Sequence, residues 1–438
     1  MSLDAATAFR QRSGPVGCAY GRREYPVDTE LTAKLPTVAV VHVSRDGHIR
    51  PLLPLVAALR DRGARTVQWA YPEWEAECAA AGGEFRTVPD FGIDMDQPPT
   101  NLIAVAEFIA RATERVTPWM TEQIRRSGAD VVLRDTIAQW GRYAAYEAGL
   151  PQVAFSPAMA PHRGIHPPLR SVPAALAMLA AGTHDALRLR RVSRRLEQRY
   201  GAPIGGWLEV LGGRYGSTTL IGTSRELQIN PEGLAGEDVR FVGPLRAASP
   251  PGSREEPALA VLADEEELVY VSLGTAFEDR PAFFRDAARA LARPGRRVVL
   301  SIGRIAPQAI GPLPAGVTAH THVDQLAVLR RADLFLTHGG FNSVQEGLVA
   351  GVPLLLFPQM QEQALNAERV SELGAGLRLR RATPARIGAR ADLILSEPRF
   401  RAAAGRTGAD LRAAVDMDGA VDAVLSAAAG QRSVFVKH

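Results

Sequence analysis

The stretch that decides the fold runs over residues 322–363 and reads HVDQLAVLRRADLFLTHGGFNSVQEGLVAGVPLLLFPQMQEQ. Its apolar runs at 332–337 and 352–357 predict two buried strands, and residues 343–350 between them predict a helix. His338 and the two glycines after it therefore lie where a strand ends and a helix begins. Open parallel sheets bind ligands at such places, and a helix N-terminus offers N–H groups to an anion. The stretch predicts a binding site for a phosphate group.

The same alternation of strand and helix extends outward from this stretch. It is typical of parallel, doubly wound sheets, because each helix carries the chain back across the sheet. We expect strands at residues 37–43, 66–70, 130–135, 152–156, 268–273, 297–302 and 317–323, with strand-like pieces over 218–243. The predicted fold class is α/β, with two such domains facing each other across a cleft.

A segment rich in Pro, Ser and charge, residues 246–257, reads RAASPPGSREEP and is the best domain boundary. It separates a first domain, residues 37–245, from a second domain, residues 258–438. We expect the last helix of the second domain to cross back to the first. Residues 1–36 precede the first strand and are predicted to be a flexible N-terminal extension.

Composition excludes several classes of protein. The chain has 438 residues, of which 46% are hydrophobic and 22% charged, as in ordinary globular proteins. A net charge of +4 does not argue for nucleic acid, and two cysteines, Cys18 and Cys78, cannot form a disulfide framework. No run reaches the roughly 18 apolar residues that span a membrane, and the polar N-terminus lacks a signal core. We expect a cytoplasmic protein without a transmembrane segment.

Residues 157–215 are rich in Pro and Arg and are predicted to be less regular. Within them lies an apolar stripe at helical spacing, flanked by arginines. The stripe is Leu189, Val192, Leu196 and Tyr200, and the flanks are Arg188, Arg191, Arg194 and Arg195. A basic face in contact with solvent is the simpler interpretation, and an acidic partner or a membrane surface is the alternative. The role of the segment stays open.

Two motifs in the second half carry hydrogen-bond donors suited to phosphate. Residues 272–275, reading SLGT, close a predicted strand, where a glycine lets the backbone approach a ligand and two hydroxyls can donate. His338, its glycines and Asn342-Ser343 gather several more donors at the start of a helix. The second motif is the more specific, because strand-to-helix turns often resemble the first.

Two acidic residues suit hydroxyl groups better than phosphate. Glu346 lies about one turn after Ser343 and can accept from a ribose diol, although a capping box of the two residues explains them equally well. Glu362 and Gln363 follow a strand end, and a carboxylate beside an amide can recognise vicinal hydroxyls of a sugar. The alternative for Glu362 is an acid that stabilises a helix N-terminus.

With these motifs in this order, residues 322–363 resemble the donor-binding signature of the family 1 glycosyltransferases. The likeness is to the bacterial macrolide and natural-product branch, where segments similar to THGGFNSVQEGLVAGVP and FPQMQEQALNAERVSELGAG occur. SLGT, DGHIRP and VVLRD also fall in the family's order. The resemblance implies the GT-B fold, in which the first of two Rossmann-like domains binds the acceptor and the second the nucleotide-sugar.

The resemblance also implies roles for single residues. His338 contacts the pyrophosphate, Glu346 binds the ribose hydroxyls, and the backbone of Val323 reads the base. The implied donor-binding residues are Ser272, Gly274, Thr275, His322, Val323, Gln325, His338, Gly340, Asn342, Ser343, Glu346, Glu362 and Gln363. Two positions depart from the family pattern. His322 stands where tryptophan often stacks on uracil, and Asp324 replaces the usual proline and adds a negative charge, so the base is the least determined part of the donor.

The first half supplies a base. Residues 47–51, reading GHIRP, match the family's G-H-x-x-P loop, whose histidine deprotonates the acceptor hydroxyl, and Asp135 matches the acid that orients it. A hydroxyl is a poor nucleophile until a base takes its proton, so His48 and Asp135 are the predicted catalytic residues. We expect His48 just ahead of a helix, where the dipole opposes its protonation. His42, inside the strand pattern, is expected to be structural.

Apolar residues in or next to loops of the first half are candidates for acceptor binding. They are Phe91, Ile93, Trp119, Phe155 and Met159, with Met95 and Met120 nearby. Aromatic and methionine side chains suit a flat apolar molecule such as a polyketide, a macrolide or an aromatic natural product. A core position is the alternative for each of them.

Two D-x-D pairs, at residues 94–96 and 416–418, resemble the metal-binding pair of another glycosyltransferase fold. Neither follows a nucleotide-binding strand, and the helix N-terminus with His338 can meet the charge of a pyrophosphate. We therefore expect surface pairs, no metal and no other cofactor, since the nucleotide-sugar is a co-substrate.

Together these features predict an inverting glycosyltransferase that moves a hexose from a UDP-glucose-like donor to a hydroxyl of an apolar small molecule. One alternative is a nucleotide-sugar epimerase on the same fold, which would not need His48 and Asp135. Another is a non-catalytic nucleotide-sugar-binding partner of a second enzyme. The expected partners are the donor and the acceptor, without nucleic acid, and a homodimer is left open.

Overall fold

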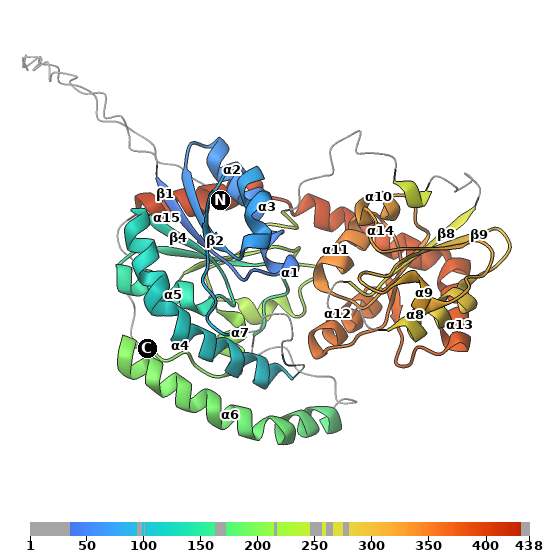
Figure 1. Cartoon of the computed structure of the whole chain (residues 1–438), viewed down its shortest axis with the longest axis horizontal. Helices are drawn as coiled ribbons and strands as arrows, with labels where there is room; N and C mark the ends of the chain where they lie inside the picture. Colours follow the sequence, from blue (N-terminus) through green and yellow to red (C-terminus); the bar gives the residue numbers. More distant parts are fainter. Residues whose placement is uncertain are drawn as a thin grey trace, which may run out of the picture. The chain divides into compact units, whose positions relative to one another are not determined.

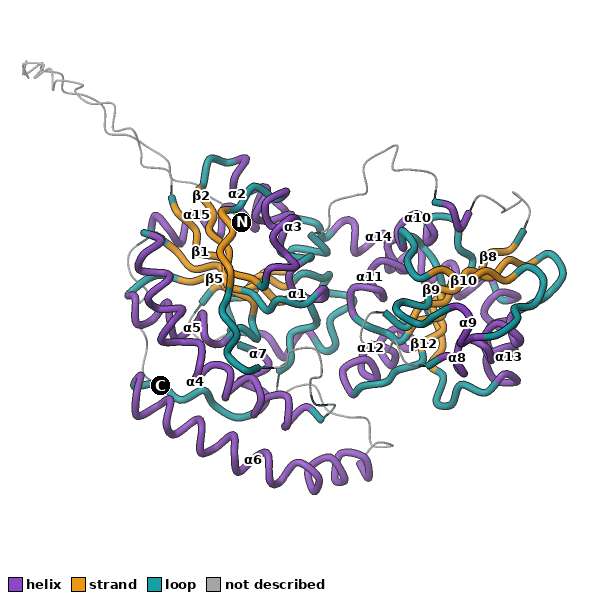
Figure 2. Tube along the Cα trace, viewed as in Figure 1, coloured by secondary structure: helices purple, strands orange, loops and turns teal. Residues whose placement is uncertain are grey.

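The computed structural model describes residues 36–93, 99, 101–162, 172–213, 217–245, 256–259, 266–274 and 280–430 (Figure 1). Thr275, the first D-x-D pair, Met95 and the first 35 residues lie outside the described residues. Two parallel sheets flanked by helices organise the described chain (Figure 2). The predicted α/β class with two Rossmann-like domains is confirmed.

The first sheet has the strand order β3-β2-β1-β4-β5-β6-β7, and its strands are parallel. They are β1 (Thr37–Val41), β2 (Arg65–Ala70), β3 (Glu84–Thr87), β4 (Val131–Asp135), β5 (Gln152–Ser156), β6 (Thr218–Ile221) and β7 (Val239–Phe241). The helices are α1 (Asp46–Ile49), α2 (Leu53–Asp61), α3 (Glu75–Ala80), α4 (Leu102–Ser127), α5 (Gln139–Ala148), α6 (Val172–Tyr200) and α7 (Trp207–Gly212), with 3₁₀ turns η1 (Pro72–Trp74) and η3 (Pro231–Leu234). Strands β1, β4 and β5 are fully buried because helices cover both faces, which explains the apolar runs at residues 38–41, 131–133 and 153–155.

The second sheet has the order β10-β9-β8-β11-β12-β13 and is likewise parallel. Its strands are β8 (Glu267–Ser272), β9 (Arg296–Ser301), β10 (Val317–His320), β11 (Leu334–Thr337), β12 (Leu354–Leu356) and β13 (Gly376–Arg378). The accompanying helices are η4 (Pro257–Leu259), α8 (Pro281–Leu291), α9 (Pro307–Ile310), α10 (Gln325–Leu329), α11 (Phe341–Val349), α12 (Gln361–Glu372), α13 (Pro384–Ser396) and α14 (Pro398–Ala413).

The strand order reverses once in each sheet, between β1 and β4 in the first and between β8 and β11 in the second. Ligands of open α/β sheets bind outside the carboxyl ends of the strands at this reversal. The segments that end these four strands carry His48, Asp135, Gly274 and His338. The topology therefore places the predicted base and the predicted phosphate site at the binding edge of their own sheets.

The last described helix, α15 (Met417–Ala429), follows the second sheet in sequence but packs on the first. Val421 and Val424 are buried in one apolar cluster with residues of β1, β4 and β5. Asp416 caps this helix, because its Oδ1 accepts from the backbone N–H of Gly419 at 2.8 Å, and Asp418 lies 3.5 Å from Arg62. The second D-x-D pair thus serves a helix cap and a surface ion pair.

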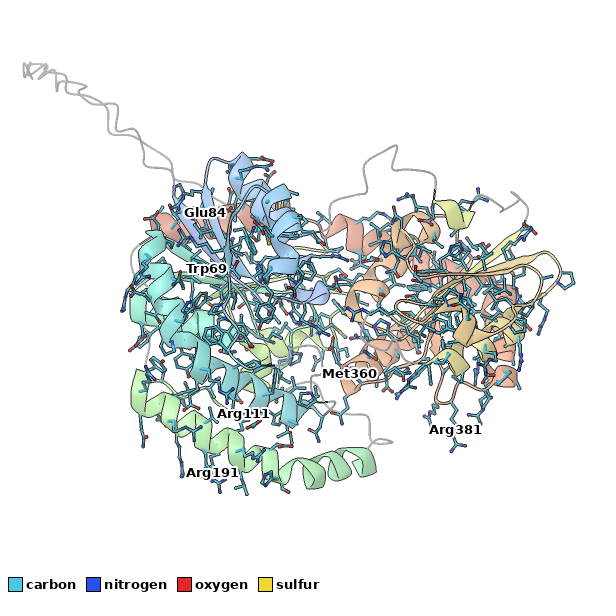
Figure 3. All side chains as sticks on the ribbon, viewed as in Figure 1. Trp69, Glu84, Arg111, Arg191, Met360 and Arg381 are labelled. Carbon is cyan, nitrogen blue, oxygen red and sulfur yellow. The ribbon has the colours of Figure 1, made fainter. Side chains whose placement is uncertain are left out.

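Of the two longest described helices, α4 was not expected from the sequence, and α6 was expected only over its apolar stripe, residues 189–200. Helix α4 begins after Asn101, whose side chain accepts from Ile103 N at 2.8 Å, and it ends at Gly128 in the left-handed conformation. Helix α6 occupies much of the segment predicted to be less regular and runs along α4 (Figure 1). The prediction is therefore wrong over residues 172–200, whereas residues 157–162 and 201–206 form neither helix nor strand. The Pro and Arg content of the segment favoured an irregular interpretation. In the structure the arginines lie on the exposed side of the helix, as Arg191 shows (Figure 3).

The arginine-rich side of α6 is partly neutralised by its neighbour. Arg195 donates to both carboxylate oxygens of Glu114 on α4, at 2.6 and 2.8 Å. The other arginines of the flank, Arg188, Arg191 and Arg194, are exposed. Among the helices in the part of the chain that the structure describes, none combines the length and the apolar character needed to cross a membrane.

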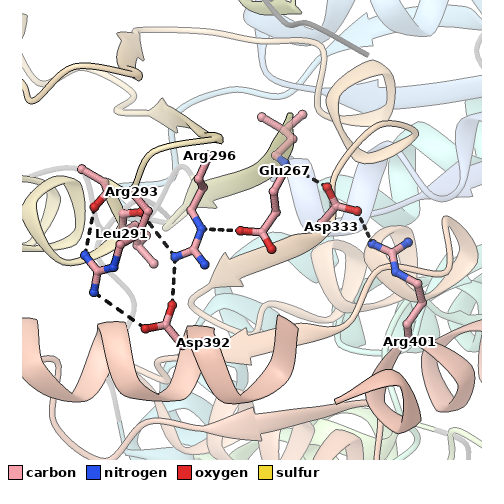
Figure 4. A network of polar contacts seen from close by, with 9 residues as sticks. Glu267, Leu291, Arg293, Arg296, Asp333, Asp392 and Arg401 are labelled. Carbon is pink, nitrogen blue, oxygen red and sulfur yellow. Dashed lines mark hydrogen bonds and ion pairs between the residues drawn. The ribbon is translucent and has the colours of Figure 1, made fainter. Parts of the chain in front are cut away.

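A polar network fixes the outer helices to the second sheet (Figure 4). Arg296, at the start of β9, pairs with Glu267 on β8 and, at 3.0 Å, with Asp392 on α13. Asp333, just before β11, accepts from Leu268 N at 2.9 Å and from Arg401 on α14 at 2.7 Å. These contacts hold neighbouring strands in register at the edge opposite to the predicted phosphate site.

Candidate active site

His48 and Asp135 meet at the carboxyl edge of the first sheet. Asp135 ends β4 and is fully buried, and its Oδ1 accepts from the backbone N–H of Ile137 at 2.8 Å. Its other oxygen, Oδ2, lies 2.8 Å from Nδ1 of His48, whose side chain is 27% exposed. A proton on Nδ1 then donates to the carboxylate, which leaves Nε2 as the atom that can accept a proton from a substrate.

The charge environment of His48 differs from the sequence expectation. Desolvation acts to lower the pKa of His48, but the Asp135 carboxylate outweighs it and Glu362 adds to the effect, so the pKa lies above its ordinary value. The expected helix dipole does not act as predicted, because His48 lies in the last turn of α1, a helix of only 4 residues. The carboxylate therefore sets the basicity of His48, and the helix does not.

The His338 imidazole sits between two glycines at the end of β11. A Cβ atom built on Gly340 would lie 2.4 Å from His338 Nε2, and one built on Gly274 would lie 2.6 Å from His338 Cε1. Gly274 also has φ of +71°, a conformation that side chains disfavour. Burial lowers the pKa of His338 to about 4, so the ring is neutral near pH 7 and donates one hydrogen bond without adding charge.

Helix α11 begins at Phe341, directly after the glycines, and not near residue 343 as predicted. Its N-cap is Gly340, and no described side chain forms a cap hydrogen bond there. The alternative interpretation of Ser343 and Glu346 as a capping box is therefore excluded, because Ser343 already lies within the first turn. The N–H groups of this turn remain directed toward whatever binds beside His338.

Glu346 and Gln325 form a hydrogen-bonded cluster next to this helix start. Gln325 Nε2 donates to Glu346 Oε2 at 2.6 Å and approaches Ser343 Oγ at 3.4 Å. The hydroxyl of Tyr270 donates to Gln325 Oε1 at 3.2 Å, which orients the amide. The buried carboxylate of Glu346 is therefore fixed in orientation next to the start of α11, where the sequence predicts a ribose contact.

Two observations connect the His338 region with the His48 loop. Asn342 Nδ2, in the first turn of α11, donates to the backbone oxygen of Gly47 at 3.3 Å. Glu362, in the first turn of α12, is close enough to His48 for its charge to raise the histidine's pKa. Residues from the two halves of the chain, which form the first and the second sheet, therefore share one site.

Glu362 and Gln363 have different roles in the structure. Glu362 keeps an exposed side chain, yet desolvation by the surrounding protein raises its pKa, opposed by His48 and Asn366. Gln363 is buried, and its Oε1 accepts from the backbone N–H groups of Gln359 and Met360 at 2.8 and 3.2 Å. The oxygen of Gln363 thus caps its own helix, so only Glu362 offers acceptor atoms to a sugar.

The two residues that depart from the family pattern, His322 and Asp324, have different surroundings in the structure. His322 is exposed and its imidazole is available for stacking, and Val323 beside it is buried. Asp324 is the N-cap of α10, because its Oδ1 accepts from Ala327 N at 3.0 Å. The carboxylate of Asp324 is therefore committed to the cap of this helix.

Ser272, at the end of β8 in the SLGT motif, accepts a hydrogen bond from the backbone N–H of Gly274 at 3.2 Å.

The predicted acceptor residues divide into three groups. Phe91, Ile93 and Trp119 are partly buried beside the cluster between the first sheet and α4, and the Phe91 and Trp119 rings meet edge to face at 5.6 Å. Phe155 is fully buried inside the first sheet's core, so its prediction as an acceptor contact is wrong. Met159 packs against the apolar cluster of the second sheet.

Sequence reasoning missed several residues that shape the site. Asn366 donates to the backbone oxygen of Gly339 at 2.9 Å and fixes the turn after His338. Trp69, Tyr71 and Trp140 line a pocket together with Phe91 and Ile93. The three aromatic residues stand in sequence contexts typical of strand and helix cores, which give no sign of a pocket. For Asn366, the only sequence signal is the glycine-rich turn after His338, which it contacts. Within the described residues, no cluster of three or more His, Cys, Asp or Glu side chains could hold a metal ion.

Comparisons with known proteins identify the family. The family described as "Erythromycin biosynthesis protein CIII-like, C-terminal domain" matches residues 288–417. The oleandomycin glycosyltransferase of Streptomyces antibioticus is 31% identical over 360 residues, which cover 78% of this chain and 79% of that protein. The NDP-glycosyltransferase YjiC of Bacillus subtilis (strain 168) is 28% identical over 354 residues, covering 78% and 84%.

A solved structure agrees with these relatives. The glycotransferase of kitacinnamycin superposes with a TM-score of 0.76 at 28% identity, covering 90% of this chain and 99% of that chain. The two chains thus share their fold over nearly their whole length. The chain is a sugar-transferring enzyme that belongs to the family 1 glycosyltransferases of the natural-product branch, with the GT-B fold.

Proposed function

We propose that this enzyme transfers a hexose from a UDP-sugar to a hydroxyl group of an apolar natural product, with inversion at the anomeric carbon. The observation that carries the proposal is the His48–Asp135 pair at 2.8 Å, joined to the His338 region by the contact of Asn342 with Gly47. A base within reach of the donor site is what direct displacement needs.

In the proposed reaction, His48 Nε2 takes the proton of the acceptor hydroxyl while Asp135 stabilises the imidazolium that forms. The acceptor oxygen forms a bond to the anomeric carbon as the bond to the diphosphate oxygen breaks on the opposite face. The products are a β-glycoside from an α-linked donor, UDP, and a proton on His48. The raised pKa of His48 matches this role, because it strengthens the base.

The departing diphosphate gains negative charge in this step. His338 and the N–H groups in the first turn of α11 stabilise it, as fixed dipoles do for charge that develops in a transition state. The neutral imidazole donates a hydrogen bond, and the approach of a dianion raises its low pKa toward protonation. Metal is not needed for this step.

The proposed donor is a UDP-sugar with a glucose-like hexose. Glu346, oriented by Gln325, offers acceptor atoms to both hydroxyls of a ribose, and a deoxyribose would leave one interaction unmade. Glu362 presents its carboxylate near His48, where sugar hydroxyls would lie. TDP-sugars are the competing donors. The oleandomycin enzyme named among the relatives supports a macrolide or another apolar natural product as acceptor.

A donor panel tests the proposal. UDP-glucose, UDP-galactose and TDP-glucose are each offered with pooled polyketide, macrolide and phenolic acceptors, and nucleoside diphosphate release and product stereochemistry are measured. We expect the highest rate with UDP-glucose and a β-linked product. Retention of configuration, or release from TDP-glucose alone, contradicts the proposal.

Replacing the base tests the mechanism. His48→Ala should lower transfer by roughly 10²- to 10⁴-fold, because the acceptor hydroxyl then loses its general base. UDP affinity, measured by calorimetry, should stay within about twofold of the wild-type value. His184→Ala, at an exposed position on α6, is the control and should change neither quantity. Wild-type turnover in His48→Ala would exclude His48 as the base.

A further inference from the structure

An apolar pocket lies where β1 and β2 end and α4 and α5 cover the first sheet. Its lining includes His42, Trp69, Tyr71, Phe91, Met120 and Trp140, and we call it the aromatic pocket. Aromatic rings on several sides suit a flat ring system, because they offer large contact areas at small cost in conformational entropy. Trp69 is labelled in Figure 3.

Two polar side chains interrupt this apolar lining. His42 is 4% exposed, and neither of its ring nitrogens has a hydrogen-bond partner among the described residues. Trp69 is 1% exposed, and its indole Nε1 likewise has none there. Buried polar atoms are nearly always paired in folded proteins, so two such residues lining one pocket point to a polar group that enters it.

The chemistry of His42 makes it a versatile partner. Burial lowers the pKa of His42 to about 4, opposed by the charge of Asp135, so its ring is neutral near pH 7. A neutral imidazole offers one N–H donor and one bare nitrogen acceptor. The Trp69 indole adds a donor only. A hydroxyl group, which both donates and accepts, can donate to the bare nitrogen of His42 and accept from the Trp69 N–H.

The aromatic pocket adjoins the catalytic pair. Val43 and Ser44 line it and continue directly into α1, which carries His48. His42 is also close enough to Asp135 and His48 for both to act on it electrostatically. The pocket therefore lies beside the loop that carries His48.

We propose that His42 and the Trp69 N–H form an acceptor-specificity point, which selects flat aromatic acceptors that carry a second hydroxyl beside the one that reacts. This inference rests on the proposed function, since it assigns the acceptor class of the same site. It replaces the expectation that His42 is structural. A site built to hydrogen-bond a hydroxyl rejects the analogue that lacks it, because buried polar atoms then stay unpaired.

The test compares a naphthol that has one hydroxyl with the set of naphthalenediols that carry a second hydroxyl on the far ring. With UDP-glucose, the wild-type kcat/KM for the best diol should exceed that for the naphthol by about tenfold or more. In His42→Phe, which keeps an aromatic ring without polar atoms, this ratio should fall to about two, the statistical value for two reactive groups.

Two further variants separate recognition from stability. Trp69→Phe removes the indole N–H together with part of the ring. It should lower the diol preference partially, because His42 keeps its polar atoms. Thr66→Val is the matched control, because Thr66 lies on the same strand, is buried, and has a hydroxyl oxygen without a described partner, but does not line the pocket. It should leave the diol preference unchanged.

The outcomes divide clearly. A wild-type enzyme that does not prefer any diol, or a preference that survives in His42→Phe, overturns the inference. Equal losses for naphthol and diol in both variants also overturn it, because they indicate a structural role. If His42→Phe does not fold, the wild-type ratio and Trp69→Phe decide. Transfer to other pooled acceptors but to no naphthalenediol leaves the proposed function intact and rejects the inference, whereas no transfer to any acceptor rejects the proposed function.

Discussion

At the scale of single residues, Asp135 determines how the rate of transfer depends on pH. The pKa of His48 is raised by this carboxylate, and only the neutral form of His48 can accept a proton. We therefore expect kcat/KM to fall as the pH drops through a pKa above the ordinary value for histidine. Asp135→Asn should move this acid limb to lower pH, because it removes the charge that holds the proton.

The same variant should also lower the maximum rate, by roughly 10³- to 10⁴-fold, because an amide that donates to Nδ1 leaves the proton on Nε2, the wrong tautomer. Profiles of kcat/KM between about pH 5 and pH 9 measure both effects. Asp46→Asn removes a half-buried acid from helix α1, one that pairs with Arg50 at 3.1 Å, and serves as the control. An unshifted acid limb in Asp135→Asn would refute the coupling.

Gly340 is the second residue whose identity has a direct consequence. Its backbone is not in the left-handed region, since its φ is −58°, so alanine fits the backbone but would place Cβ 2.4 Å from His338 Nε2. Gly340→Ala should displace the imidazole and weaken UDP binding by about tenfold or more, measured by calorimetry. Gly405→Ala on α14, where no atom lies within 4 Å of the added Cβ, should leave the affinity unchanged.

At the scale of secondary-structure elements, Asp333 connects β8, β11 and α14 (Figure 4). Asp333→Ala should lower the free energy of unfolding by about 1–3 kcal/mol, because the backbone N–H of Leu268 loses its acceptor and Arg401 its partner. Urea denaturation measures the change. Asp333→Asn keeps an acceptor oxygen and should lose less, and equal losses in the two variants would show that the charge matters and the hydrogen bond does not.

At the scale of the whole molecule, helix α15 makes the first sheet depend on the end of the described chain. Val424→Asp buries a carboxylate against β4 and β5 and should destabilise the first sheet by several kcal/mol. We expect a lower Tm and faster hydrogen exchange in β4 and β5. Ser426→Asp adds the same charge at an exposed position of the same helix and should have no such effect. Equal melting of the two variants would argue against this packing.

The sequence by itself determined the alternation of elements and, through it, the two parallel sheets and the edges at which they bind. Strand and helix periodicity are local, so the apolar runs of β1, β4, β8 and β11 are visible without the fold. The glycines around His338 were also visible, because their spacing is local. The helix α6 was missed in part, since its local pattern is interrupted by Pro and Arg.

Only the tertiary structure decided which distant residues meet. His48 and Asp135 stand 87 positions apart in the sequence. Neither local pattern predicts the distance of 2.8 Å between Nδ1 of His48 and Oδ2 of Asp135. The burial of Phe155, the commitment of Asp324 and Gln363 to helix caps, and the presence of His42 and Trp69 in one pocket likewise depend on strand order and helix packing. Long-range contacts determine burial and electrostatics. They therefore raise the pKa of His48 and bury the polar atoms of His42 and Trp69 in the aromatic pocket.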